Sequence, residues 1–148
     1  MPMKAPARIC LSFFPDAPVL ESRPIGGGHI HQSWAVRVGG EGSFLLQRIN
    51  TAVFQTPEAL MDNIARMAQH LQRIGYEGAI LQPRRTKRGT LLAHDGEGGV
   101  WRAFPFIENT FLLQPPVDEQ TAWQAARAFG RFTRALQTLP PPPPLPFT

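Results

Sequence analysis

Residues 44–71 read FLLQRINTAVFQTPEALMDNIARMAQHL, and this stretch decides the fold because a strand pattern changes into a helix pattern within it. Its first residues are β-rich and predict a strand over residues 43–49. Thr56 then offers an N-cap, Pro57 suits the first helical position, and Gly75 stands just beyond the last apolar residue. The apolar residues of this predicted helix recur at intervals of three and four: Leu60, Ile64, Met67, Leu71 and Ile74. The helix therefore carries one apolar stripe that can lie on a sheet.

The remaining elements are predicted to be short strands and one further helix. Strands are expected over residues 33–38, 79–86, 89–94 and 100–107, with another before the glycines at 26–28, and a helix over 118–138. Gly39–Gly42 and the DGEGG stretch at 95–99 are turn signals that join neighbouring strands into hairpins. Hairpins without strand–helix–strand crossovers indicate an α+β fold, with an antiparallel sheet of about five strands and one packed helix.

The predicted helix over residues 118–138 begins at Asp118 and Glu119 and has arginines toward its end. Its apolar face runs through Ala122, Ala125, Phe129, Phe132 and Leu136. No other predicted element supplies an obvious partner for this face, so self-association through an uncovered helix is one possibility. The proline run that follows predicts extended polyproline II structure, which suits a spacer better than an SH3-type ligand.

Composition limits the class of protein. The 148 residues are 43% hydrophobic and 18% charged with a formal charge of +4, which predicts a globular domain and only a weak preference for anions. Cys10 is the single cysteine, so no intrachain disulfide can form, and a reducing cytoplasm is expected. No run of about 18 apolar residues occurs, so no membrane contact is expected. The basic residues at 84–88 lack interleaved aromatics and predict solvated surface rather than nucleic-acid binding.

The glycine-rich stretch GGGHIHQSW, residues 26–34, allows several interpretations. A metal site is set aside because His29 and His31 have no nearby third ligand. A Walker A loop would end in Gly-Lys-Ser/Thr, and a dinucleotide fingerprint would need glycine in place of His31. A protein-kinase-type loop joins two antiparallel strands and covers phosphates from above, and it fits this context.

A cation on the third strand is the next feature that such a loop requires. Arg48 stands where a protein kinase has lysine, and alternation places Leu46 on the same face, as an apolar residue under adenine and a cation at the phosphates would require. Gln47 is expected on the other face. Acceptors for the cation are sought in the following helix, at Glu58, Asp62 and Asn63, and the backbone of residues 104–108 would meet the adenine edge.

These residues resemble a known family. IGGGHIHQSWAV, FLLQRINTAVFQTPEALMDNIARMAQHL, WRAFPFIENT and AARAFGRFTRALQTLP are similar to the N-terminal portion of the phosphotransferase family that holds N-acetylhexosamine 1-kinase and relatives of aminoglycoside phosphotransferases and choline kinases. The resemblance implies a kinase-like N-lobe, ATP with Mg²⁺, and transfer of the γ-phosphate to a sugar hydroxyl. By position it implies these nucleotide contacts: Gly26, Gly28, His29, Ser33, Leu46, Arg48, Asp62, Asn63, Phe106 and Ile107.

The resemblance also implies a division of labour. Residues 1–107 would form the nucleotide-binding N-lobe, and 108–148 a hinge, the first C-lobe helix and the proline-rich tail. The catalytic base, the magnesium ligands and the acceptor site are expected in the rest of the C-lobe, so little turnover is expected from the 148 residues alone. His94-Asp95-Gly96 lies in a hairpin turn, where Asp-Gly is a structural pair. The alternative hypothesis is an inactive module that binds nucleotide or a partner.

Overall fold

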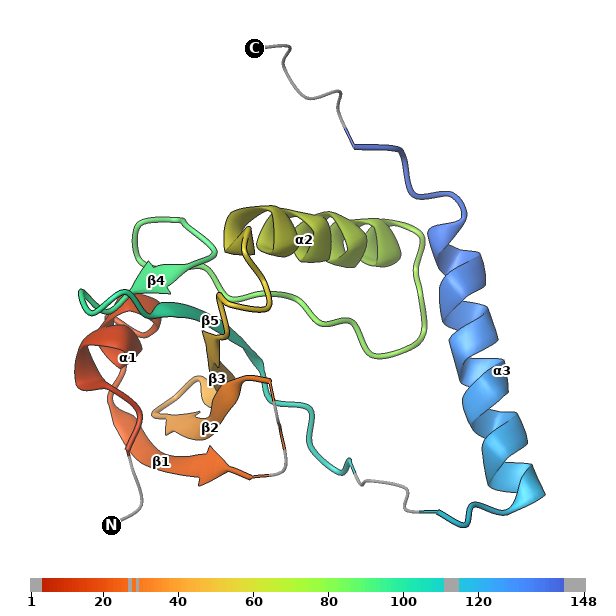
Figure 1. The fold of residues 1–148 in the computed structure, drawn as a ribbon, viewed down its shortest axis with the longest axis horizontal. Coiled ribbons are helices and arrows are strands. Elements are labelled where there is room, and N and C mark those ends of the chain that lie inside the picture. Colours follow the sequence, from red (N-terminus) through yellow and green to blue (C-terminus); the bar gives the residue numbers. More distant parts are fainter. Residues whose placement is uncertain (1–3, 27, 29, 111–114, 143–148) are drawn as a thin grey trace. The chain divides into compact units, whose positions relative to one another are not determined.

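The computed structural model describes residues 4–26, 28, 30–110 and 115–142. Its elements follow in the order α1 (Ala7–Phe13), β1 (Val19–Ile25), β2 (Gln32–Val38), β3 (Gly42–Ile49), α2 (Pro57–Arg73), β4 (Ala93–His94), β5 (Val100–Pro105) and α3 (Glu119–Leu136) (Figure 1). The chain separates into two compact units, residues 1–66 with 81–109 and residues 67–80 with 110–148. The sheet and the first half of α2 belong to the first unit, and α3 to the second.

The five strands form one antiparallel sheet in the order β1-β2-β3-β5-β4, which confirms the predicted α+β class. Both predicted hairpins are present. In the first, Val38 pairs with Gly42, and Gly40 takes a φ of 75°, a left-handed conformation that glycine adopts without steric cost. In the second, β4 and β5 flank the turn over residues 95–99.

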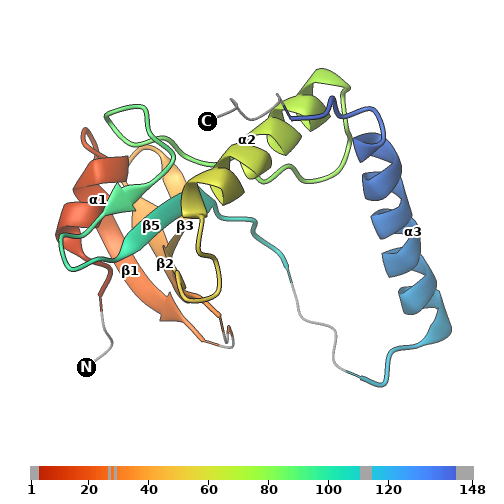
Figure 2. The ribbon, with the colours of Figure 1, turned by 45° about the horizontal axis from the view of Figure 1, so that its top comes forward.

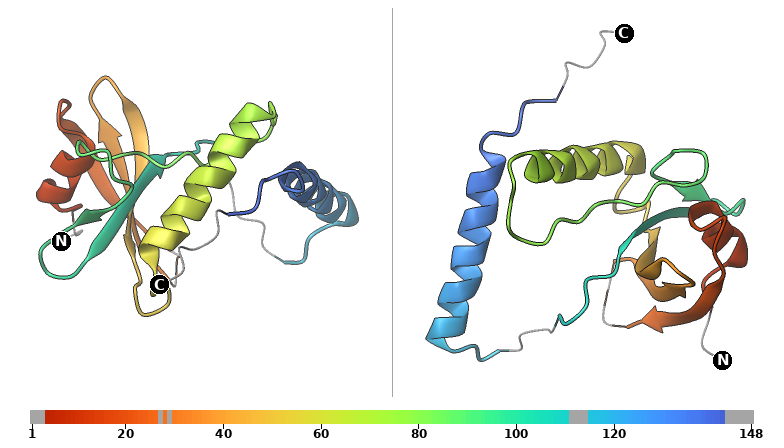
Figure 3. Two further views of the ribbon diagram at one scale, coloured as in Figure 1. Left: turned by 90° about the horizontal axis from the view of Figure 1, so that it is seen from above. Right: turned by 180° about the vertical axis from the view of Figure 1, so that it is seen from behind.

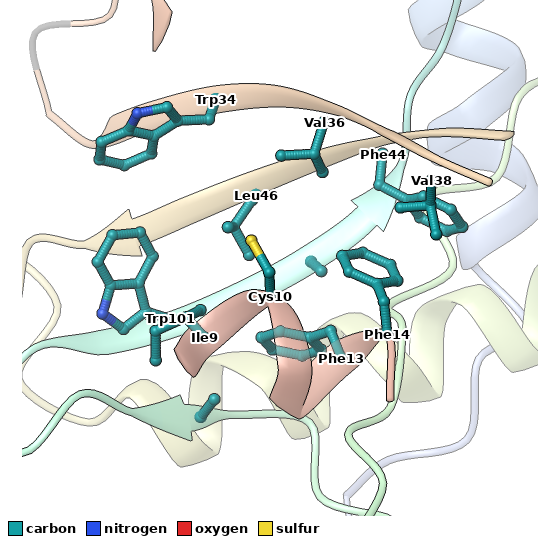
Figure 4. Packing of buried hydrophobic residues seen from close by; sticks show 12 residues of the cluster. Ile9, Cys10, Phe13, Phe14, Trp34, Val36, Val38, Phe44, Leu46 and Trp101 are labelled. Carbon is teal, nitrogen blue, oxygen red and sulfur yellow. The ribbon is translucent and has the colours of Figure 1, made fainter. Parts of the chain in front are cut away.

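Two helices cover opposite faces of the sheet: α1 lies on one side of the strands and α2 on the other (Figure 2; Figure 3, left). On the α1 face Ile9, Cys10 and Phe13 pack against strand residues that include Trp34, Leu46 and Trp101 (Figure 4). The α2 face is packed by Ile49, Met61, Leu92, Val100 and Phe104, with Leu45, Phe54, Ile64 and Leu91 beside them. The sheet therefore has two distinct hydrophobic cores, one on each of its faces.

Helix α2 begins at Pro57 and is followed by Gly75, as predicted, but the whole predicted stripe is not buried. Its C-terminus closes with Gly75 at a φ of 67°, while the amide of Tyr76 donates to the carbonyl of Leu71 at 2.9 Å. Met61 and Ala68 are fully buried, whereas Ile74 is 44% exposed. The buried side of α2 thus includes Met61 and Ala68 beside Leu71 and leaves Ile74 out, so it is rotated slightly from the predicted stripe.

Two further expectations were wrong. Residues 79–86 form no strand. Pro83 has no amide to donate, and this segment meets the sheet through Arg84, whose amide donates to the carbonyl of Ala103 at 2.8 Å. Helix α1 was not expected, because seven residues beside prolines carry little periodic signal. Its three buried side chains, and not its local propensity, explain why it forms.

The second unit holds the predicted C-terminal helix. The Asp118 side chain caps α3 by accepting from the amide of Thr121 at 2.8 Å. In α2, Arg73 donates to Nδ1 of the buried His70, so Nε2 carries the hydrogen and donates to the carbonyl of Ala135 at 3.0 Å. Within the described residues, no helix is long and apolar enough to cross a membrane.

No residue of α3 is buried. Phe129 is 67% exposed and Trp123 is 59% exposed. Trp123 is therefore not a core residue, although Trp34 and Trp101 are.

Candidate functional site

The glycine turn connects β1 to β2, where Ile25 at the end of β1 pairs with Ser33 near the start of β2. Gly26 and Gly28 are exposed, and a side chain added at Gly26 would meet no atom within 4 Å. At Gly28 the nearest atom would be the His31 carbonyl oxygen at 3.6 Å. Internal packing therefore does not require glycine at these two positions, and their backbone is open to a ligand. His29, the third expected contact of this turn, lies outside the described residues.

The alternation predicted for β3 is confirmed, but its two faces have other neighbours than expected. Leu46 has no exposed surface and packs with Ile9 and Trp34 on the α1 face. Leu45, Gln47 and Ile49 lie on the α2 face. Since Leu46 is enclosed by the α1-side core, its position does not match the expected contact with adenine.

Arg48 shares the α1 face with Leu46, and its partner is in the β4–β5 turn. Its Nε lies 3.9 Å from Oδ2 of Asp95. Asp62 and Asn63 are exposed on α2, which covers the opposite face, so the expected pairing of the β3 cation with this helix is not present. Arg48 is thus a partly exposed arginine with a carboxylate partner of its own.

Asp95 organises the hairpin turn, as the structural interpretation of His94-Asp95-Gly96 predicted. Its Oδ1 accepts from the amides of Glu97 at 2.9 Å and Gly99 at 2.8 Å, and its Oδ2 accepts from Nε1 of the buried Trp101 at 2.8 Å. The Trp101 bond is the largest reason why the pKa of Asp95 is lowered, with the two amides and Arg48 adding to it. A carboxylate committed to three donors in a turn serves the fold.

A row of polar side chains crosses the α2 face of the sheet, on β2, β3 and β5. Ser33 pairs with Gln47 across the strands, and Gln47 pairs with Arg102. Gln47 Nε2 donates to Ser33 Oγ at 2.9 Å, and Arg102 Nε donates to Gln47 Oε1 at 3.1 Å. The row thus links the strand that follows the glycine turn to a cation two strands away.

Arg102 is buried, with 8% of its surface exposed. Its guanidinium carbon lies 5.2 Å from the centre of the Phe104 ring, and Nη1 is 3.9 Å from Sδ of Met61. Burial lowers the pKa of Arg102. Among the described residues, no Asp or Glu forms an ion pair with it. The α2 face therefore contains a buried positive charge that forms no ion pair with a carboxylate of the described residues.

His31 lies where the glycine turn enters β2. Its Nδ1 accepts from the amide of Asn50 at 3.2 Å, and its ring centre is 5.2 Å from that of Phe54. Burial and, second, the positive charge of Arg102 lower its pKa. Both findings favour a neutral His31.

Sequence reasoning missed Arg102, although its alternation with Val100 and Phe104 could have revealed a charge on an apolar face.

The segment after β5 was expected to meet the adenine edge. Phe106 is partly buried, and its amide donates to the carbonyl of Ser43 at 3.0 Å. Ile107 is 44% exposed. The amide of Phe106 is therefore already used by the sheet, and its side chain and Ile107 remain as the groups that could contact a base.

Within residues 4–26, 28, 30–110 and 115–142, no three His, Cys, Asp or Glu side chains gather where they could hold a metal ion. The glycine turn offers backbone amides, and the row of Ser33, Gln47 and Arg102 offers a hydroxyl, a side-chain amide and a positive charge. Phosphate oxygens accept hydrogen bonds from such groups, so a nucleotide matches this part of the chain better than a metal ion does.

The five-stranded antiparallel sheet, with α1 and α2 on its two faces and a glycine turn between its first two strands, matches a kinase-like N-lobe. The solved structure of spectinomycin phosphotransferase APH(9)-Ia, in complex with ADP and spectinomycin, has the same fold, with a TM-score of 0.59 at 15% sequence identity. The match covers 96% of this chain and 40% of that protein, so the chain spans about two fifths of the length of its structural relative.

Residues 21–148 match the phosphotransferase enzyme family, APH. The chain belongs to this family. The kinase-like fold and the membership of a phosphotransferase family that were expected from the sequence are thereby confirmed.

Proposed function

We propose that this chain is the nucleotide-binding part of an ATP-dependent phosphotransferase that transfers the γ-phosphate to a hydroxyl of a small molecule, with a sugar such as an N-acetylhexosamine as the acceptor. Gly26, Gly28 and Ser33 would face the phosphates, and Phe106 with Ile107 would contact the base. The observation that carries the proposal is the open glycine turn joined through Ser33 and Gln47 to a buried cation on one face of the sheet.

This division suits the chemistry. Phosphoryl transfer depends on positioning and on stabilising charge. The residues that bind the nucleotide can therefore be separate from those that bind the acceptor and accept the proton of its hydroxyl group. Mg²⁺, when bound with ATP, would neutralise phosphate charge. Within the described residues, no three His, Cys, Asp or Glu side chains gather where they could hold a metal ion, and the protein ligands of Mg²⁺ would come from the rest of the C-lobe. A cytoplasmic location, where ATP and reduced Cys10 coexist, is part of the proposal.

Titration calorimetry tests the nucleotide part directly. The 148-residue chain is titrated with ATP, ADP and adenosine, and ATP binding with a Kd of about 1 mM or tighter is expected, within the range usual for enzyme substrates. Phosphate transfer to N-acetylhexosamines by this chain alone is expected to be undetectable. The proposal fails if neither ATP nor adenosine binds, and rapid sugar phosphorylation by the chain would contradict the expected division.

A second candidate function, an interaction module without catalysis, is favoured by the exposure of α3. Phe129 and Trp123 present large apolar side chains on a helix without any buried residue. Sedimentation equilibrium of the chain beside its Phe129→Glu variant tests it. A monomer–dimer equilibrium that the variant abolishes would support self-association through α3, whereas a monomer at all concentrations would argue against it.

A further inference from the structure

We propose that Arg102 of β5, held by Gln47 and Ser33, is the cation that binds the nucleotide phosphates in this chain, in the role that the sequence pattern gives to Arg48 of β3. This inference rests on the proposed function. It changes which strand and which face of the sheet supply the charge.

The environment of Arg102 is the first argument. A guanidinium has five N–H donors and no acceptor. Within the described residues, these donors make two contacts: one to Gln47 Oε1 at 3.1 Å and one to the weakly accepting sulfur of Met61 at 3.9 Å. Burying a charge is costly, and buried arginines are usually paired with carboxylates. An anion placed beside Arg102 would satisfy the remaining donors and offset that cost.

The contrast with Arg48 is the second argument. Arg48 carries the same charge, but its side chain is 40% exposed and lies 3.9 Å from the Asp95 carboxylate. A phosphate at Arg48 would have to compete with this carboxylate. It would also lie on the α1 face, where Leu46, Trp34 and Trp101 are buried in the core and are not available to a base.

The position of Arg102 relative to the glycine turn is the third argument. Ser33 pairs with Ile25 at the foot of the turn, and the row Ser33, Gln47, Arg102 then crosses two strand spacings of about 4.8 Å each. The charge of Arg102 acts on His31, at the other end of the turn, because it contributes to lowering the pKa of that histidine. A chain of phosphates lying along this row would meet backbone amides at one end and the guanidinium at the other.

Gln47 completes the arrangement. A lysine at position 47 would place a second positive charge directly beside Arg102, since the two residues are cross-strand partners. The neutral amide instead accepts from Arg102 Nε and donates to Ser33 Oγ, so it fixes the guanidinium without repelling it. Gln47 and Ser33 are positioning residues for the cation.

The experiment compares the binding of ADP with that of adenosine, because only ADP carries the phosphates. Calorimetry is performed on the wild-type chain and on Arg102→Gln, Arg48→Gln and Arg37→Gln, each of which removes one positive charge. Arg102→Gln is expected to bind adenosine as the wild type does and to lose at least about tenfold in ADP affinity, as for a charge-assisted bidentate contact. Arg37, exposed on β2 beside Glu21, is the matched charge control, and its variant is expected to remain within about twofold for both ligands.

Two further variants address the possibility that Arg102→Gln does not fold, which circular dichroism and a urea titration would reveal. Arg102→Lys keeps the charge at its position. The exchange Gln47→Arg with Arg102→Gln keeps one guanidinium and one amide in the same row. Both are expected to retain a preference for ADP over adenosine, and this preference should weaken with added KCl as in the wild type.

The outcomes separate the two proposals. If the wild type binds neither ADP nor adenosine, the proposed nucleotide function is wrong, and this inference falls with it. If the wild type prefers ADP but a folded Arg102→Gln keeps the same ratio of affinities, Arg102 does not bind the phosphates. The inference is also wrong if Arg48→Gln is the only variant that loses the preference for ADP over adenosine. Where Arg102→Gln does not fold, the inference is wrong if Arg102→Lys and the exchange of residues 47 and 102 both lose that preference.

Discussion

Replacing Asp95 by alanine should lower the free energy of unfolding, because this side chain has a structural role in the β4–β5 turn and not a catalytic one. The side chain accepts three hydrogen bonds and lies 3.9 Å from Arg48. Loss of Oδ2 leaves the indole N–H of Trp101, a residue only 3% exposed, without its acceptor, at a cost of about 1–3 kcal/mol. The turn amides of Glu97 and Gly99 can partly turn to water, and the ion pair with the half-exposed Arg48 adds about 0–1 kcal/mol.

The sum predicts a loss of about 1–4 kcal/mol in the free energy of unfolding. Urea titration followed by tryptophan fluorescence measures it, with Trp34 and Trp101 as buried reporters. A double-mutant cycle with Trp101→Phe isolates the indole bond, and a coupling energy of about 1–2 kcal/mol is expected for it.

The pH dependence gives an independent check. The pKa of Asp95 is lowered in the folded protein, so its stabilising effect is present above its ordinary value of 3.8 and is lost as the pH falls through the folded-state pKa. The difference in stability between the wild type and Asp95→Ala should therefore shrink in acid. A difference below about 0.5 kcal/mol at neutral pH, the scale of an ordinary surface substitution, would refute this account of the turn.

Three further predictions concern other parts of the chain. Arg84, stacked on two phenylalanine rings, should cost about 1–2 kcal/mol of stability when replaced by alanine, measured by urea titration, and no change would contradict the stacking. His31 should titrate below 6.5 in an NMR pH series, and stability should fall as the pH drops below 6.5 because the unfolded chain takes up the proton first. Arg102→Gln should raise that midpoint, and an unmoved midpoint would argue against their interaction. Asp118→Ala removes the cap of α3, so circular dichroism should show less helix, and equal helicity would contradict capping by this side chain.

Much of the fold could be read from the sequence because its signals are local. Turn glycines marked both hairpins, and the cap at Asp118 and the glycine after α2 marked helix ends. Local signals failed at α1 and at residues 79–86. The short helix forms because Ile9, Cys10 and Phe13 meet the sheet, and the expected strand is absent where Pro83 interrupts its donors.

The candidate site shows the same division. The sequence by itself determined that Leu46 and Arg48 share one face of β3 and that Gln47 occupies the other, since alternation is a property of any strand. Only the tertiary structure decided which face belongs to α1 and which to α2, and it placed Arg48 with Asp95 and Gln47 with Arg102. Period-two alternation fixes relative direction alone, whereas the environment of each face depends on helices and strands far away in the chain.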